Sequence, residues 1–128
     1  MREILFRGKD VNSKEWRLGY YYTAVQGAVA IIGDGYDGYQ VKSETVGQYT
    51  GLTDKNGAKI FDGDILEGDL EDRLDPGAKW RSIVVWGTFG WMCKGRQTLP
   101  MDEFDILEGE VIGNIYDNPE LTKEAEKI

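Results

Sequence analysis

Histidine is absent from this sequence, cysteine occurs once, and no long apolar run is present. Without histidine, the most common side-chain base of acid–base and nucleophilic catalysis is missing, and zinc sites lose one of their main ligands. Cys93 has no internal disulfide partner and no histidine to act as its base, so we interpret it as a small buried hydrophobic residue rather than a catalytic thiol. The sequence therefore offers no conventional nucleophile or soft-metal site.

The apolar segments are all shorter than the roughly 18 residues that a membrane-spanning helix needs. Charged residues interrupt the start of the chain, Met1 to Arg7, too early for the apolar region of a signal peptide. A single cysteine also gives no indication of an oxidising compartment. From these features we predict a cytoplasmic protein without a membrane segment.

Glycine is abundant and proline is scarce, with 17 Gly and 3 Pro in 128 residues. Many short strands joined by tight turns need this composition, because glycine adopts the backbone conformations that turns require. The sequence predicts a mainly β fold, α+β with a minor helix, made of antiparallel strands and hairpins. We expect one domain, with a β-rich part over residues 1–118 and a short C-terminal helix or tail over 119–128, since Asn118-Pro119 is a typical helix start.

Short apolar segments bounded by glycine or polar residues mark the expected strands. The first two are expected to pair as a hairpin, and the two that flank Gly87 as another. The continuous apolar run 27–33 is typical of a strand buried on both faces. The expected strands cover residues 4–6, 16–22, 27–33, 39–41, 65–67, 81–86, 88–93 and 110–116.

Two turns in the middle of the chain carry the sharpest structural hypotheses. Asn56-Gly57 is a strong turn pair, because both residue types tolerate a left-handed backbone, and we expect it to close a tight hairpin after Asp54. Gly63 and Asp64 belong to the second expected turn, in which Gly63 has a positive φ. We interpret these five residues as structural.

The formal net charge is −8 at pH 7, which argues against non-specific attraction to nucleic-acid phosphates. Acids gather in residues 62–75 and 102–120, whereas residues 76–101 carry bases and no acid. Such segregation favours oppositely charged faces, and hence a protein partner or a homo-oligomer, although solvated turns around a sheet explain it as well.

The basic segment also contains aromatic residues and is the candidate interaction surface. Cations beside aromatic side chains are the elements of a surface on which single-stranded nucleic acid stacks its bases. The alternative is that most of these aromatics fill the core, because alternate side chains of a strand point to opposite faces. The residues of this candidate surface are Lys79, Arg81, Trp91, Lys94 and Arg96.

Carboxylates are the remaining candidates for chemistry. Asp62, Asp64 and Glu67 are close enough in sequence to be considered as ligands of Mg²⁺ or Ca²⁺. The segment from Asp54 to Gly57 lacks the ligand spacing of a calcium loop, and turn-forming aspartates explain both places. We therefore expect no metal, no cofactor and no catalytic residue.

Three stretches occur in order along the chain: Ile4-Leu5-Phe6-Arg7-Gly8 with Trp16 and Gly19, the block from Thr45 to Leu66, and the run from Val111 to Leu121. Together they resemble the YopX family of phage and prophage proteins. The resemblance implies a phage or prophage origin in a bacterium and a mostly β fold that contains a small SH3-like barrel-type part. It implies no established activity, so no catalytic residues are carried over.

These features together predict a non-enzymatic protein-binding or regulatory module in the cytoplasm of a bacterial host, acting through a protein partner or self-association. A weak nucleic-acid-binding small-barrel protein is the alternative. An enzyme that uses carboxylates and a divalent metal is the more distant one.

Overall fold

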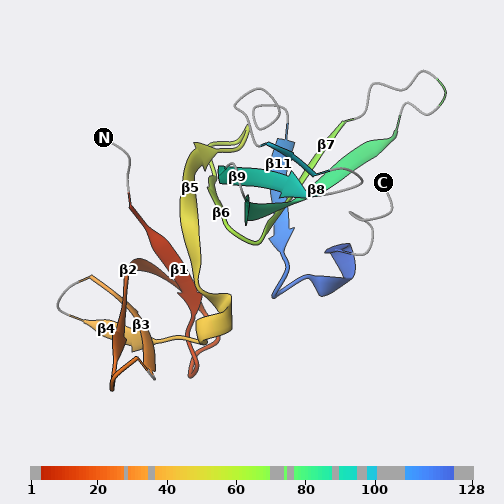
Figure 1. The fold of residues 1–128 in the computed structure, drawn as a ribbon. Coiled ribbons are helices and arrows are strands. Elements are labelled where there is room, and N and C mark those ends of the chain that lie inside the picture. The colour runs from red at the N-terminus through yellow and green to blue at the C-terminus, as the bar shows by residue number, and fades with distance from the viewer. Residues whose placement is uncertain are drawn as a thin grey trace. The chain divides into compact units, whose positions relative to one another are not determined.

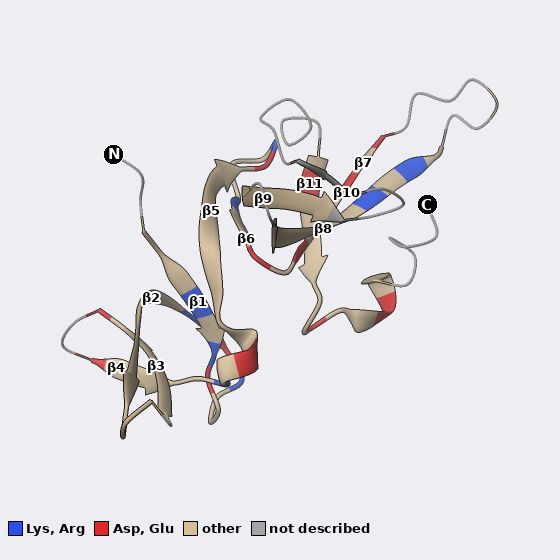
Figure 2. Cartoon of the chain, viewed as in Figure 1, with Lys and Arg blue, Asp and Glu red and all other residues tan. Residues whose placement is uncertain are grey.

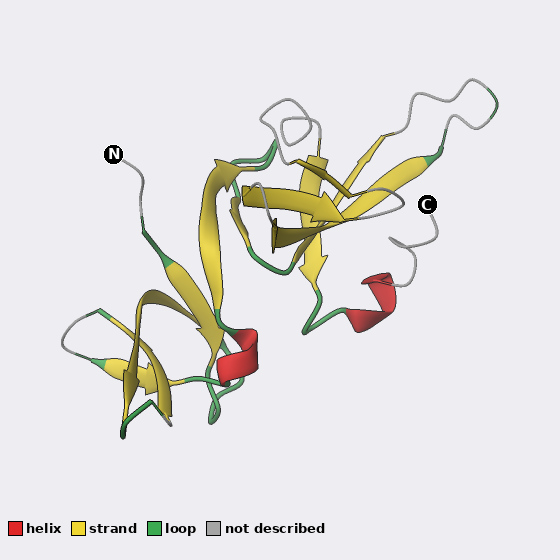
Figure 3. Ribbon diagram, viewed as in Figure 1, coloured by secondary structure: helices red, strands yellow, loops and turns green. Residues whose placement is uncertain are grey.

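The protein is described by a computed structural model that covers residues 4–27, 29–34, 37–69, 74, 77–87, 90–94, 98–100 and 109–122. The predicted mainly β fold with antiparallel strands and a minor helix is confirmed (Figures 1 and 3). The expected barrel-type part needs correction, because the described strands form two antiparallel sheets and not a closed barrel. No helix among the described residues is long and apolar enough to cross a membrane.

The chain divides into two compact units, which we call unit 1 (Met1–Gly51) and unit 2 (Leu52–Ile128). No proline-rich or polar linker marks this boundary in the sequence, since it falls inside a strand. The predicted single domain, with its break after residue 118, stays a prediction. Each unit is described separately below.

Unit 1 contains a sheet whose strands follow the order β4-β3-β2-β1-β5, and β6 of unit 2 continues the same order after β5. The predicted hairpin of the first two strands is confirmed, with Phe6 opposite Gly19 and Lys9 opposite Trp16. The elements are β1 (Phe6–Lys9), β2 (Trp16–Ala24), β3 (Val29–Gly33), β4 (Gly38–Gln40), the 3₁₀ turn η1 (Ser43–Thr45) and β5 (Gly47–Thr53).

One face of this sheet forms the core of unit 1. Ala30 and Ile32 of β3 are buried there with Val41, and Phe6 and Val46 pack against them. The alternate residues of β3, Val29 and Ile31, point to the opposite face and are only half-buried. The expectation that the run 27–33 is buried on both faces was therefore wrong, because only one face of β3 is covered.

Unit 2 is built on a second sheet with the strand order β10-β9-β8-β7-β11. The predicted hairpin around Gly87 is confirmed, because β8 and β9 pair antiparallel with Gly87 opposite Gly90. Residues 119–122 are helical, within the predicted C-terminal helix, and 123–128 lie outside the described residues. The strands are β6 (Lys59–Phe61), β7 (Asp64–Asp69), β8 (Lys79–Gly87), β9 (Gly90–Lys94), β10 (Thr98–Pro100) and β11 (Gly109–Asn114).

Both faces of the second sheet carry a hydrophobic cluster. This explains why adjacent residues of its strands, which point to opposite faces, are both apolar. On one face Leu66 and Val84 are fully buried with Ile60 of β6. On the other face Ile65 and Ile83 are buried, and residues that follow β11, among them Ile115 and Leu121, pack against them. Unit 2 therefore has two hydrophobic clusters with the sheet between them.

Candidate interaction surfaces

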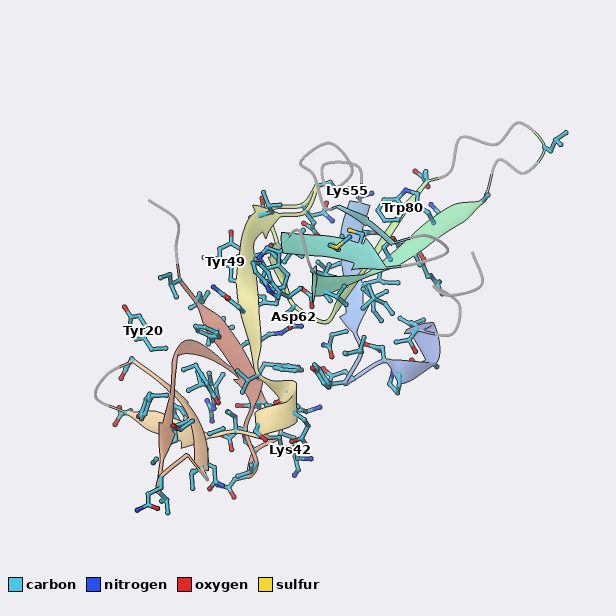
Figure 4. All side chains as sticks on the ribbon, viewed as in Figure 1. Tyr20, Lys42, Tyr49, Lys55, Asp62 and Trp80 are labelled. Carbon is cyan, nitrogen blue, oxygen red and sulfur yellow. The ribbon has the colours of Figure 1, made fainter. Side chains whose placement is uncertain are left out.

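The outer face of unit 1 exposes a row of large apolar side chains on β2. Alternate residues of a strand point to opposite faces, so Tyr21, which is opposite the fully buried Ile32, points toward the core face. Leu18, Tyr20 and Tyr22 point to the other face and are 58%, 63% and 44% exposed. We call these three residues the tyrosine face; in Figure 4 the labelled Tyr20 projects away from the strands of unit 1.

Neighbouring strands contact Tyr22 of the tyrosine face. Tyr22 lies opposite Ile31 of β3, and a Cβ placed on Gly38 of β4 would come within 2.4 Å of the Tyr22 hydroxyl oxygen. The Tyr22 ring therefore reaches across β3 to β4, where only glycine leaves room for it. Among the described residues of β2, β3 and β4, no side chain on this face is charged.

Two cations flank the start of the tyrosine face. Arg7 and Lys9 lie on β1, opposite Leu18 and Trp16 respectively. The Arg7 guanidinium carbon lies 4.7 Å from the centre of the Trp16 ring, and the Lys9 ammonium lies 5.9 Å from it. Figure 2 shows this blue band of Lys and Arg on β1. Cation–π attraction ties both charges to Trp16 at one end of the row.

The other end of the row leads into a strained turn between β2 and β3. Val25 and Gln26 have φ values of 53° and 55°, a left-handed conformation that is unfavourable for any residue with a Cβ and most of all for a β-branched one. Val25 is also 73% exposed. An apolar side chain is thus held in solvent by an unfavourable backbone, directly after the end of β2 at Ala24.

Asp10 lies on the core side of unit 1 and has a structural environment. Its side chain is 6% exposed, Oδ1 accepts the Asn12 N–H at 2.8 Å, and Oδ2 accepts Arg17 Nε–H at 3.0 Å. The Asn12 hydrogen bond, followed by the one from Arg17, lowers the pKa of Asp10 below its usual value. Arg17 in turn lies 3.9 Å above the ring of Tyr39. The contacts of Asp10 itself hold the turn between β1 and β2, so we assign no chemistry to Asp10.

The predicted basic surface is neutralised across the strands of unit 2. Register places Lys79 opposite Asp69 and Arg81 opposite Glu67. Lys79 forms an ion pair with Asp69, and Arg81 Nε lies 2.7 Å from Glu67 Oε2. The hydrogen bond from Lys79 lowers the pKa of Asp69, and the same contact raises the pKa of Lys79. Figure 2 shows the blue residues of β8 beside the red ones of β7.

Trp91 lies on the opposite side of the same sheet from Lys79 and Arg81. Trp91 is paired with Trp86 of β8, and the two rings meet edge to face with their centres 5.0 Å apart. Alternate residues of β8 point to opposite faces, so Trp86 lies on the face away from Lys79 and Arg81. Trp91 and Trp80 pack against the core, whereas Trp86 is 63% exposed. The aromatics of this segment are therefore divided between core and surface, and the structure does not bring Trp91 together with the two bases. The Lys94 side chain and the whole of Arg96 lie outside the described residues.

The residues predicted to form the first turn meet around Asp54, which is 5% exposed. Its Oδ1 accepts the N–H groups of Asn56 and Ala58, both at 2.9 Å. Gly57 has a φ of 83° and donates its N–H to the Asp54 carbonyl oxygen at 3.0 Å. Asn56 has no positive φ, so the connection between β5 and β6 is a longer turn over residues 54–58 rather than a two-residue one.

The second predicted turn lies between β6 and β7. Gly63 has a φ of 89°, in agreement with the prediction, and donates its N–H to the carbonyl oxygen of Val84 at 2.8 Å. Asp64 is 1% exposed, and its Oδ2 accepts the Phe61 N–H at 2.8 Å. Within the described residues no group of three or more His, Cys, Asp or Glu side chains is placed to hold a metal ion.

The tyrosine face was not predicted from the sequence. The signal was present, because the run from Leu18 to Tyr22 is apolar or aromatic at every position except Gly19. A strand with one face in the core and the other in solvent normally alternates between apolar and polar residues. The missing alternation on β2 marks the outer face as unusual.

This chain is similar to known proteins in its sequence family and in its fold. A protein-family model described as "YopX protein" matches residues 6–123. Among solved structures, the crystal structure of protein EF1440 from Enterococcus faecalis is similar, with a TM-score of 0.64 and 24% sequence identity. That match covers 95% of this chain and 99% of the other, and at this identity it shows the fold alone. No curated protein matches.

Proposed function

The chain belongs to the YopX family, and from that premise we propose that it is a non-enzymatic protein-binding module. The setting that the family resemblance implies, a phage or prophage gene expressed in the cytoplasm of a bacterial host, is part of this proposal. A regulatory role would follow from what the module binds.

The observation that carries the proposal is the exposure of the tyrosine face. Tyrosine is enriched in protein interfaces because it combines a large apolar ring with a polar tip and loses little conformational entropy on binding. Leu18 and Tyr20 expose more than half of their surface on a strand that is paired on both sides, where burial by a partner releases water from apolar area. A contiguous exposed apolar patch is a typical mark of an interaction site.

The nucleic-acid alternative has less support. Its predicted cations, Lys79 and Arg81, each pair with an acid on the neighbouring strand, so fewer counterions would be released by phosphate binding. The enzyme alternative has less support as well, because Asp10, Asp54 and Asp64 each accept backbone N–H groups in turns.

The test compares two exposed aromatic residues of equal exposure. Tyr20 on the tyrosine face and Trp86 in unit 2 are both 63% exposed, so Trp86→Lys is a matched control for Tyr20→Lys. A protein captured from a bacterial lysate by the wild type is purified, and its binding isotherm is measured with all three chains. The proposal expects about a tenfold or larger loss of affinity for Tyr20→Lys only. Equal affinities of the three chains, or a loss of affinity restricted to Trp86→Lys, would exclude the tyrosine face as the binding surface.

A further inference from the structure

We infer that the tyrosine face pairs with the same face of a second copy of this chain, in a two-fold symmetric dimer. The inference rests on the proposed function, because it names the occupant of the surface proposed there. Its three supports are the charge of unit 1, the composition of the face and the arrangement of its two ends.

Charge favours unit 1 over unit 2 as the dimer surface. Unit 1 contains six Lys and Arg against six Asp and Glu, whereas unit 2 contains nine against seventeen, so the whole net charge of −8 belongs to unit 2. Two copies that met through unit 2 would bring like charge together. Two copies that meet through unit 1 carry no net charge into the interface.

The composition of the face suits self-pairing. A two-fold interface places the same patch on both sides, so any charged group near the axis would face its own copy. The central residue of the row, Tyr20, is flanked by Leu18 and Tyr22, and none of the three is charged. Aromatic rings that meet at such an axis pack edge to face or offset without electrostatic conflict.

The ends of the row are also complementary. A two-fold axis at Tyr20 makes the two β2 strands antiparallel, so the Trp16 end of one copy lies beside the Tyr22 and Val25 end of the other. Lys9 lies opposite Trp16, four residues from an axis at Tyr20, so the two copies of Lys9 are about 26 Å apart along the strands, roughly three times the Debye length of about 8 Å at physiological salt. Arg7 lies opposite Leu18, two residues from the axis, so its two copies are about 13 Å apart along the strands. Arg7 is 9% exposed and packs on the Trp16 ring of its own copy. The exposed Val25 gains the Trp16 ring as an apolar neighbour.

The experiment measures self-association by sedimentation equilibrium of the full chain. The wild type is expected to form a reversible dimer, and Tyr20→Lys and Tyr20→Glu are each expected to raise its dissociation constant about tenfold or more. Trp86→Lys is the control and leaves the dimer unchanged. Because position 20 lies on the axis, an equal mixture of Tyr20→Lys and Tyr20→Glu recovers a mixed dimer that neither variant forms alone.

The mixed dimer separates self-pairing from a folding defect, since a misfolded variant is not rescued by its opposite charge. If the wild type stays monomeric at protein concentrations up to about 1 mM, its dissociation constant is weaker than that of a specific dimer, and the inference is overturned. A dimer that both Tyr20 variants keep would also overturn it, because its interface would lie elsewhere. If the wild type is monomeric and Tyr20→Lys no longer binds a purified protein ligand, self-pairing is overturned and the proposed function stays in place.

Discussion

Asp54 and Val111 are 57 positions apart in the chain, and the Asp54 Oδ2 atom accepts the Val111 N–H at 2.8 Å. Next to this contact the Lys55 N–H bonds the carbonyl oxygen of Gly109 at 3.0 Å. Both contacts fall on β11, which is the last strand in the order of its sheet. The turn over residues 54–58 therefore occupies backbone groups of an edge strand, which would otherwise invite pairing with another chain.

Replacing Asp54 should destabilise the fold. In Asp54→Ala three backbone N–H groups lose their acceptor, those of Asn56, Ala58 and Val111, and we expect a loss of about 2–3 kcal/mol in the free energy of unfolding. Asp54→Asn should lose nearly as much, because all partners are donors and the amide keeps an acceptor on one side only. Urea unfolding followed by tryptophan fluorescence measures both.

The matched control is Asp34→Ala, which removes the hydrogen bond that the exposed Asp34 side chain accepts from the Asp37 N–H. Water replaces that acceptor, so the loss should stay below about 0.5 kcal/mol. If Asp54→Ala and Asp34→Ala unfold at the same urea concentration, the contact with Val111 contributes nothing to stability.

Gly63 and Gly57 give a pair of substitutions with the same backbone and different surroundings. Both have a positive φ, 89° and 83°, so valine at either position costs about 1–2 kcal/mol of left-handed strain. A Cβ at Gly63 would also lie 3.3 Å from Tyr116 Cε2, whereas a Cβ at Gly57 meets nothing within 4 Å. Gly63→Val should therefore lower the melting temperature more than Gly57→Val. An unchanged melting temperature for Gly63→Val contradicts the turn as described.

Acid should remove the contribution of Asp10. The folded-state pKa of Asp10 lies below its usual value of 3.8, so the ionised carboxylate stabilises the fold above that value, and the stabilisation disappears as pH falls through the lowered pKa. The melting temperature of Asp10→Asn should lie below that of the wild type at neutral pH. The gap should narrow below about pH 4.

Glu15→Gln is the control for Asp10, since Glu15 also approaches Arg17, at 3.8 Å, but is 70% exposed. An exposed pair of this kind contributes little, so Glu15→Gln should follow the wild type at every pH. A gap between wild type and Asp10→Asn that is constant from pH 2 to pH 7 would disagree with the lowered pKa.

Relieving the strain at Val25 should stabilise the fold. Asparagine tolerates a left-handed backbone better than valine does, so Val25→Asn should raise the free energy of unfolding by about 0.5–1 kcal/mol. Val25→Ile keeps the branch at Cβ and should gain nothing. Calorimetry measures the melting temperatures of the two variants and the wild type. A melting temperature of Val25→Asn below that of the wild type would show that the turn is not strained. In the dimer proposed above, the same variant should also weaken self-association.

The strands were predictable from local patterns, and their partners across the chain were not. Short apolar segments and glycine placed β2, β8 and β9, because these signals act over a few residues, whereas the first strand was expected over residues 4–6 and lies at Phe6–Lys9. The pairing of Lys79 with Asp69 depends on register, and it converts charges that are segregated along the sequence into charges that cancel in space. A sequence shows the segregation, but only the sheet shows the cancellation.

The exposed surface of the protein could not be predicted from the sequence for a related reason. Burial depends on what covers a face, and the tryptophans of unit 2 illustrate it, since Trp91 packs on the core while Trp86, opposite it, is exposed. The apolar run of β2 gave no indication of which of its faces would stay open. Asp54 was assigned correctly to a turn by local pattern, yet its bond to Val111 joins segments that no local pattern connects.

The most direct measurement is photo-cross-linking from position 20 in living bacteria. A photoreactive phenylalanine analogue replaces Tyr20 in one version of the chain and Trp86 in another, at equal expression. We expect a discrete cross-linked protein species from position 20, either a second copy of the chain or one other protein, and none from position 86. No discrete species from position 20, or the same species from both positions, would contradict the tyrosine face as an interaction surface.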